Sequence, residues 1–86
     1  MIPLYSQLPS IDLHGYDRDY ARILINEFIY DQYKLKQESI IIVHGNGSGI
    51  LKRMTQDVLK KNKYVIDYRL FYNNVGMTLV KINIDK

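Results

Sequence analysis

The chain has 86 residues, of which 47% are hydrophobic and 24% are charged, a composition typical of one soluble domain with its own core. The absence of cysteine excludes disulfides and thiolate metal sites, and no apolar run is long enough to span a bilayer. The net charge is a mild +3 and the first residues lack the pattern of a secretory signal, so we expect a cytoplasmic protein without a membrane partner.

The first third of the chain predicts a strand followed by a helix. Both prolines fall within residues 1–9, which we expect to form an extended arm before a single domain over residues 10–86. Residues 10–13 are short and apolar enough for a strand that stops at His14. From Asp17, a residue type that favours the N-cap, apolar side chains recur at helical spacing. This stripe consists of Ala21, Leu24, Ile25, Phe28, Ile29 and Tyr33, and Tyr20 beside it is also expected in the core.

The remainder of the chain predicts a second helix and three more strands. Residues 39–43 are a β-branched run typical of a buried strand. A glycine-rich loop at residues 45–49 precedes a helix with an apolar stripe of Leu51, Met54, Val58 and Leu59. Alternating residues predict strands at 65–72 and 77–84, and the Asn-Asn-Val-Gly segment at 73–76 predicts the turn between them.

The expected order is therefore β-α-β-α-β-β. Two helices can cover one face of four strands, so the sequence predicts an α/β fold, a two-layer sandwich of the α+β type with a four-stranded mixed sheet. Both helices would pack on one face. The opposite face would stay partly open, and Arg69 and Lys81 are expected to point to it.

Two histidines follow the first two predicted strands. His14 comes after the strand at residues 10–13, and His44 comes after the strand at residues 39–43. A strand-helix-strand unit makes its strands parallel, so both strands end at the same edge of the sheet, where open α/β sheets bind ligands. We therefore expect Asp12, His14, His44 and the glycine-rich loop to lie in one neighbourhood.

The residues at this edge suit anion chemistry, although each also has a plain structural interpretation. Asp12 and His14 are two apart, so on a strand their side chains share a face and the carboxylate can orient the imidazole; Asp12 could instead cap the following turn. The three glycines of residues 45–49 allow close approach to a ligand, and the helix start after them favours an anion. A turn that only connects strand and helix has the same composition. Ser48 can cap this helix or donate its hydroxyl to a phosphate.

The charge distribution favours a polyanionic partner. Residues 1–44 carry four basic and six acidic side chains, whereas residues 45–86 carry eight basic and three acidic ones. A basic second half attracts phosphates and releases counterions from nucleic acid. The alternative is a solvated helix face whose lysines favour the C-terminal end of the helix dipole.

Two motifs, taken together, resemble a known family. Ile11-Asp12-Leu13-His14-Gly15 and the segment from His44 to Leu51 occur in the order and at the separation of the Smr (small MutS-related) domain family, and the later segment at residues 76–80 also fits. The resemblance runs from about Ser10 to Ile84. It departs from the family at Asn46, where a lysine or arginine is frequent, and this removes a phosphate contact.

The resemblance implies a fold like the C-terminal domain of translation initiation factor three. It also implies nucleic-acid binding and, in several members, endonuclease activity that nicks DNA or cleaves messenger RNA on ribosomes. The family motifs carry over to Asp12, His14, Gly15, His44, Gly45, Gly47, Ser48 and Gly49.

The leading hypothesis is an endonuclease that cleaves phosphodiester bonds of DNA or RNA. His14, oriented by Asp12, would act as general base or acid, and His44 would take the complementary proton transfer or hold a phosphate oxygen. Backbone N–H groups of residues 47–49 would stabilise the developing charge. Further phosphate contacts are expected from residues that complete the predicted site: Gly45, Asn46, Gly47, Ser48, Gly49, Lys52, Arg53 and Arg69.

Two other functions remain open at this point. One is a non-catalytic module that binds RNA or the ribosome, and the other is an adaptor that docks a protein on the open sheet. No cofactor is required by these hypotheses: Asp12 and His14 could hold a divalent metal such as magnesium, but two ligands are too few for a convincing site. We expect a monomer by default.

Overall fold

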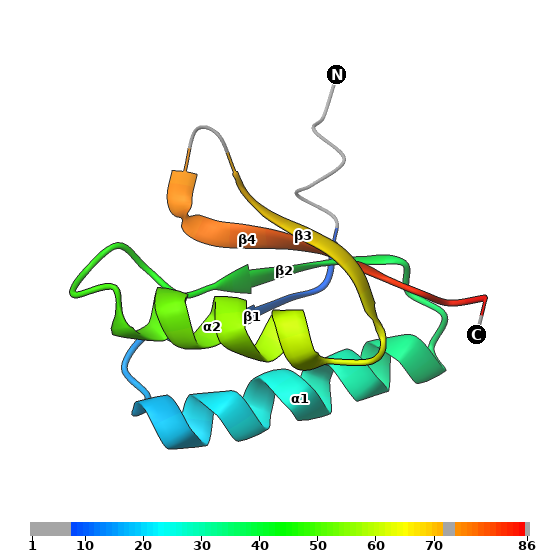
Figure 1. Cartoon of the computed structure of the whole chain (residues 1–86), viewed down its shortest axis with the longest axis horizontal. Helices are drawn as coiled ribbons and strands as arrows, with labels where there is room; N and C mark the ends of the chain where they lie inside the picture. Colours follow the sequence, from blue (N-terminus) through cyan, green and yellow to red (C-terminus); the bar gives the residue numbers. More distant parts are fainter. Residues whose placement is uncertain (1–7, 72–73, 86) are drawn as a thin grey trace.

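The computed structural model describes residues 8–71 and 74–85 of the chain, and its elements follow the predicted order (Figure 1). The extended arm expected at residues 1–9 lies almost wholly outside the described residues. Neither described helix is long and apolar enough to cross a membrane. The elements are β1 (Ser10–Asp12), α1 (Arg18–Lys34), β2 (Ser39–Val43), α2 (Ile50–Lys61), β3 (Val65–Phe71) and β4 (Asn74–Ile82).

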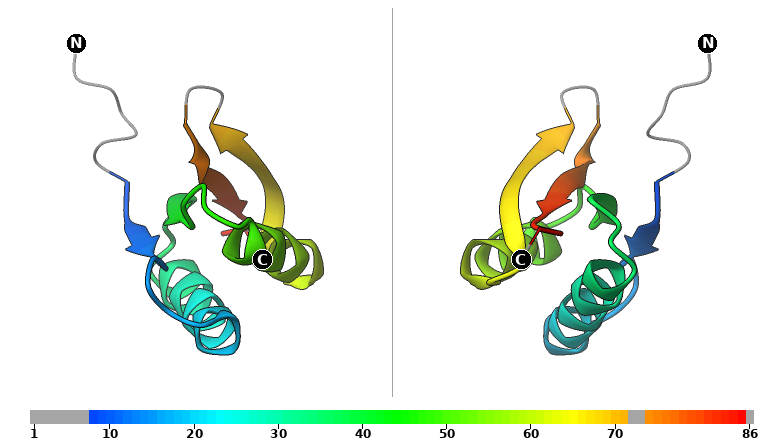
Figure 2. Two further views of the ribbon diagram at one scale, coloured as in Figure 1. Left: turned by 90° about the vertical axis from the view of Figure 1, so that its left-hand side faces the viewer. Right: turned by 90° about the vertical axis from the view of Figure 1, so that its right-hand side faces the viewer.

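The four strands form one mixed sheet in the order β1-β2-β4-β3. β1 and β2 are parallel, with Asp12 opposite Val43, whereas β4 is antiparallel to both β2 and β3. Both helices lie on the same side of the sheet, as the end-on views show (Figure 2). The predicted two-layer architecture is confirmed, and the parallel pairing brings the carboxyl ends of β1 and β2 to one edge.

Local signals in the sequence explain the start and the orientation of α1. The Oδ1 atom of Asp17 accepts a hydrogen bond from the backbone N–H of Tyr20 at 2.9 Å, so this residue is the N-cap that the sequence predicts. The helix buries Ala21, Ile25 and Ile29, which repeat every four residues and therefore form one stripe. α1 is thus held at its start by a cap and along its length by the core.

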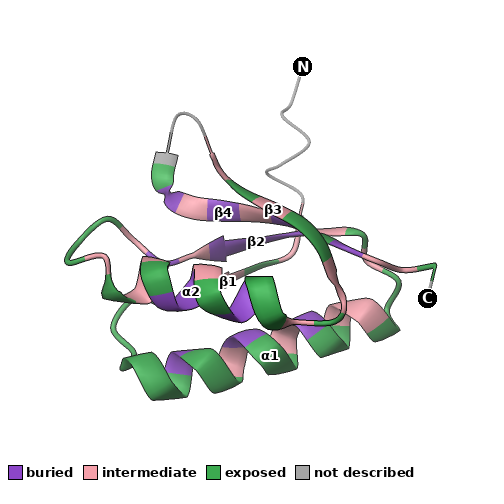
Figure 3. Ribbon diagram, in the orientation of Figure 1, coloured by how far each residue is buried: buried purple, intermediate pink, exposed green. Residues whose placement is uncertain are grey.

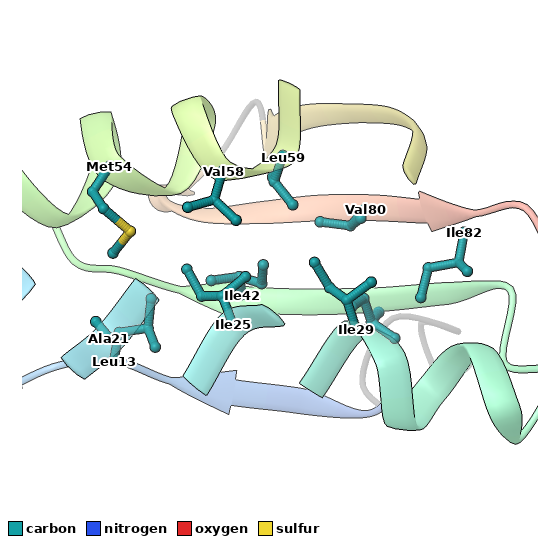
Figure 4. Close-up of a cluster of buried hydrophobic side chains, with 11 residues drawn as sticks. Leu13, Ala21, Ile25, Ile29, Ile42, Met54, Val58, Leu59, Val80 and Ile82 are labelled. Atoms are coloured by element: carbon teal, nitrogen blue, oxygen red, sulfur yellow. The ribbon is translucent and has the colours of Figure 1, made fainter. Parts of the chain in front are cut away.

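The core fills the space between the helices and the sheet (Figure 4). It contains the inward side chains of β2 and β4, such as Ile42 and Val80, together with Leu59 of α2. Burial follows the same division, because the outer surfaces of both helices are largely exposed (Figure 3). On the uncovered sheet face, Arg69 and Lys81 are exposed as expected.

Two local predictions are wrong. The turn expected at residues 73–76 gives way to strand from Asn74 onward, because this segment bonds on two sides: Asn74 lies opposite Phe71 of β3, and the carbonyl oxygen of Gly76 accepts from two backbone N–H groups just after β2. Pairing on both sides outweighs the turn-forming composition. Tyr20 is 48% exposed rather than buried, since it lies one residue off the buried stripe and its ring packs against that of Tyr16 at 5.2 Å.

Candidate functional site

A cleft of about 460 Å³ opens where β1 and β2 end. The backbone N–H of Leu13 donates to the carbonyl oxygen of Val43 at 2.8 Å, which extends the parallel pairing to the edge of the cleft. Asp12 and both histidines lie along this cleft, so topology brings together residues that are thirty positions apart. The full lining is Asp12, His14, Gly15, Val43, His44, Gly45, Asn46, Gly47, Ser48, Gly49, Ile50 and Leu51.

His14 is presented to solvent by a tight turn. The backbone N–H of Tyr16 donates to the carbonyl oxygen of Leu13 at 3.1 Å, and Gly15, the third residue of the turn, has a φ of 88°. A positive φ at this position is what a type II turn requires, and it is the reason for a glycine. Leu13 is fully buried, so the turn is anchored in the core while the His14 side chain is exposed.

The carboxylate of Asp12 stabilises this turn. Its Oδ1 atom accepts a hydrogen bond from the backbone N–H of His14 at 2.9 Å. The expectation that Asp12 orients the imidazole is therefore not met in this conformation; the alternative interpretation, a strand-end carboxylate that caps the turn, describes the geometry. Asp12 places the backbone from which the His14 side chain projects.

His44 is buried, with only 4% of its surface exposed, and both of its ring nitrogens have partners. Nδ1 lies 3.1 Å from the carbonyl oxygen of Gly45, and Nε2 lies 2.8 Å from the Oγ1 atom of Thr78. A carbonyl oxygen can only accept, so in this arrangement Nδ1 carries the proton, and in a neutral ring Nε2 accepts from the Thr78 hydroxyl. The ring therefore fixes the start of the glycine-rich loop.

The electrostatic environment of His44 favours the neutral ring. Burial lowers its pKa below the ordinary value of 6.5, and this effect outweighs the hydrogen bond to Gly45, which raises it. The positive charge of Lys52 lowers the pKa further. A buried, neutral and doubly hydrogen-bonded imidazole is a poor candidate for the second proton transfer that the sequence suggested.

The glycine-rich loop is held at its base and open above it. The backbone N–H groups of His44 and Gly45 both donate to the carbonyl oxygen of Gly76, at 2.9 and 3.0 Å. Above them, the backbone N–H groups of residues 47–49 make no backbone hydrogen bond to any described residue. Gly49, the N-cap residue just before α2, is left-handed with a φ of 85° and provides no side-chain cap. These N–H groups, next to a helix start, suit an anion.

The basic residues predicted to bind phosphate lie in three different places. Lys52 is half-buried in the first turn of α2, near His44, but does not line the cleft. Arg53 is exposed and lines a neighbouring cleft between the helices. Arg69 lies on β3, the edge strand farthest from β1. Three strand spacings, about 14 Å, separate these two strands, so Arg69 is not part of the cleft.

A comparison with protein families identifies the chain. The model of the Smr domain matches residues 11–83, which is most of the sequence. The chain belongs to the Smr family.

Two curated relatives of this Smr domain are named endonuclease MutS2. The protein from Clostridium perfringens is 36% identical over 78 residues, which cover 91% of this chain and 10% of that protein. The protein from Clostridioides difficile is 32% identical over 76 residues, 85% of this chain and 10% of that protein. The chain spans about a tenth of the length of these relatives.

Two solved structures share the fold of this Smr domain. The Smr domain of Thermus thermophilus MutS2 superposes with a TM-score of 0.85 at 20% identity, covering 88% of this chain and 99% of that chain. YdaL, a stand-alone small MutS-related protein from Escherichia coli, gives a TM-score of 0.83 at 19% identity and covers 90% of this chain and 66% of that chain.

Sequence reasoning missed the residue that holds His44 in place. Thr78 is 1% exposed and faces inward from β4, between apolar neighbours on the same face. A lone hydroxyl among inward-facing apolar residues is the signal that could have found it, because such a group needs a buried partner. Among the described residues, no three His, Cys, Asp or Glu side chains gather where they could hold a metal ion.

Proposed function

We propose that this Smr domain cleaves phosphodiester bonds of nucleic acid, DNA or RNA, with His14 as its general acid or base. The observation that carries the proposal is the position of His14: an exposed imidazole that shares one cleft with the open N–H groups of the glycine-rich loop. Histidine suits this role because its ordinary pKa lies near neutral pH.

The glycine-rich loop supplies hydrogen-bond donors for a phosphate beside His14. A phosphate placed in the cleft would accept hydrogen bonds from the N–H groups of residues 47–49, which have no competing backbone partner among the described residues. Preorganised donors of this kind stabilise negative charge that develops on the phosphate oxygens during cleavage. The Ser48 hydroxyl is available to the same phosphate, since its one hydrogen bond with a described residue is long: its oxygen accepts from the backbone nitrogen of Ile50 at 3.4 Å.

Asp12 and His44 act in this proposal as positioning residues. Asp12 fixes the turn that carries His14, and His44 fixes the base of the loop through Gly45 and Thr78. In an RNA substrate, the neighbouring 2′-hydroxyl would attack phosphorus, His14 would accept its proton, and the bond from phosphorus to the 5′-oxygen would break; in DNA the nucleophile would be water. The leaving oxygen would take its proton from solvent, because the His44 ring nitrogens already have partners.

The test is a nuclease assay on labelled single-stranded RNA and on supercoiled DNA, each with and without magnesium. We expect His14→Ala to lower the cleavage rate by about a hundredfold or more, the usual contribution of a general acid or base. Asp12→Asn keeps an oxygen that can accept from the His14 N–H, so it should retain most activity, whereas Asp12→Ala should not. Glu27→Ala, an exposed change on α1, is the control. Equal cleavage by wild type and His14→Ala would refute the assignment.

One observation favours the second candidate, a module that binds RNA or the ribosome without cutting. Only one imidazole at the site is available for proton transfer, because the ring nitrogens of His44 are occupied and the Asp12 carboxylate bonds to the backbone. This candidate predicts salt-sensitive binding that is unchanged by His14→Ala, with no cleavage product in the same assay.

A further inference from the structure

A groove between α1 and α2 leads away from the candidate site. We define the interhelical groove by Arg18, Arg22 and Asn26 of α1 and by Arg53, Asp57 and Lys61 of α2. Both helices begin at the end of the molecule that carries the glycine-rich loop, and they lie side by side (Figures 1 and 2). None of the α1 residues in this groove was expected to have a functional role from the sequence.

The groove adjoins the cleft that contains His14. Ile50 lines both that cleft and a second one of about 340 Å³ between the helices. Arg22 and Asp57 in turn line both this second cleft and a third one of about 390 Å³ farther along the helices. A ligand seated at the glycine-rich loop that passes Ile50 therefore reaches the space between α1 and α2.

The charges of the groove match a chain of phosphates. Four cations, Arg18, Arg22, Arg53 and Lys61, stand against two acids, Asp19 and Asp57. Asp19 lies 3.3 Å from Arg22 and 3.9 Å from Arg18, and Asp57 lies 3.3 Å from Lys61. These ion pairs are exposed to water and therefore weak, so the cations can exchange a carboxylate for a phosphate.

Arg53 is the cation most open to a ligand. Its side chain has no hydrogen bond or ion pair to any described residue, and it lies one turn from the start of α2. A guanidinium group presents five donors in a planar fork that matches phosphate oxygens. Arg22 faces it across the second cleft, from the other helix.

We infer that the interhelical groove binds the phosphates that flank the reactive bond, with Arg22 and Arg53 as its main contacts. This inference rests on the proposed function and specifies the path of its substrate. The competing path crosses the uncovered sheet face, where Arg69 and Lys81 lie. That face is the weaker choice, because Asp67 stands opposite Lys81 in the strand register and Arg69 is three strands away from β1.

The experiment compares two double variants that remove the same charge from the two surfaces. Arg22→Gln with Arg53→Gln changes the groove, and Arg69→Gln with Lys81→Gln changes the sheet face. Binding is measured by fluorescence anisotropy with labelled single-stranded oligouridylate and oligothymidylate, in the His14→Ala background so that the probes stay intact. Salt is varied between about 50 and 200 mM. Circular dichroism verifies the fold of each variant, and Arg22→Lys with Arg53→Lys keeps the charge.

We expect the groove variant to lose the electrostatic part of binding. The slope of log K against log salt should become shallower by about 1.4, which corresponds to two phosphate contacts on a single strand. The lysine variant and the sheet-face variant should keep the wild-type slope. An unchanged slope for the groove variant, or an equal loss for the sheet-face variant, would overturn the inference.

The same data separate this inference from the proposed function. If cleavage depends on His14 but the groove variant binds with the unchanged slope, only the groove assignment fails. If the groove variant binds with the shallower slope but His14→Ala still cleaves the substrate, only the catalytic assignment fails. If neither probe binds at any salt concentration, the groove assignment fails, and the nuclease assay decides the proposed function independently.

Discussion

Replacing Thr78 with valine tests the contact that fixes the glycine-rich loop. Valine has nearly the same shape as threonine but no hydroxyl, so the Nε2 atom of the buried His44 loses its partner at 2.8 Å. A buried polar atom left without a hydrogen bond costs about 1–3 kcal/mol. At about 4–8 °C per kcal/mol for a domain of this size, the midpoint of thermal unfolding should fall by at least about 4 °C.

The chain offers a matched control at Thr55, where the same substitution should raise the free energy of unfolding. Thr55 is fully buried and its hydroxyl has no partner among the described residues, so Thr55→Val removes a desolvation cost of about 1 kcal/mol or more. Valine and threonine have similar helix propensities, so the backbone contributes little. Urea and thermal unfolding of both variants give the comparison. If Thr78→Val is as stable as wild type, or both variants lose stability equally, the reasoning is wrong.

Two further predictions concern the pH dependence of stability and the glycine-rich loop. Because burial lowers the pKa of His44, the imidazole binds a proton more tightly in the unfolded chain than in the folded one. The free energy of unfolding should therefore decrease as pH falls below about 6.5. Urea unfolding from pH about 7.5 to 5.5 should show a smaller decrease for His44→Gln than for wild type, and an equal decrease would contradict the assignment. Gly49→Ala should cost about 1–2 kcal/mol, because alanine is strained at a φ of 85°. Gly47→Ala is its control, since Gly47 is outside that region with equal space around it, and equal losses in the two variants would argue against backbone strain.

The sequence predicts most of the fold because its signals are local and agree with one another. Residues 39–43 are a β-branched run that becomes β2 with the same bounds, and Asp17 caps α1 where the spacing of apolar residues begins. The start of β4 could not be found in this way. Asn74 and Gly76 resemble a turn until the residues after β2 supply partners for the backbone, and that contact is not local in sequence.

The candidate site could also be predicted only in part from the sequence. Parallel pairing of the first two strands is a rule of topology, so the sequence could place His14 and His44 at one cleft. The direction of each hydrogen bond could not be predicted. Asp12 bonds to the backbone of His14 rather than to its ring, and His44 bonds to Thr78, thirty-four residues later. Such contacts depend on side-chain positions that are fixed only when the helices pack on the sheet.

The two hydrogen bonds to the carbonyl oxygen of Gly76 have a consequence for how the glycine-rich loop can move. Because one carbonyl oxygen of β4 accepts hydrogen bonds from the N–H groups of His44 and Gly45, the base of the loop can move only by breaking two bonds that continue the pairing of the central strands β2 and β4. The crown of the loop at residues 46–48 carries no such restraint from the described backbone. The loop thus joins a base that is hydrogen-bonded to β4 to a tip whose backbone is free to change conformation. Under the proposed function, the tip could adjust to different substrates while the register of the sheet stays the same.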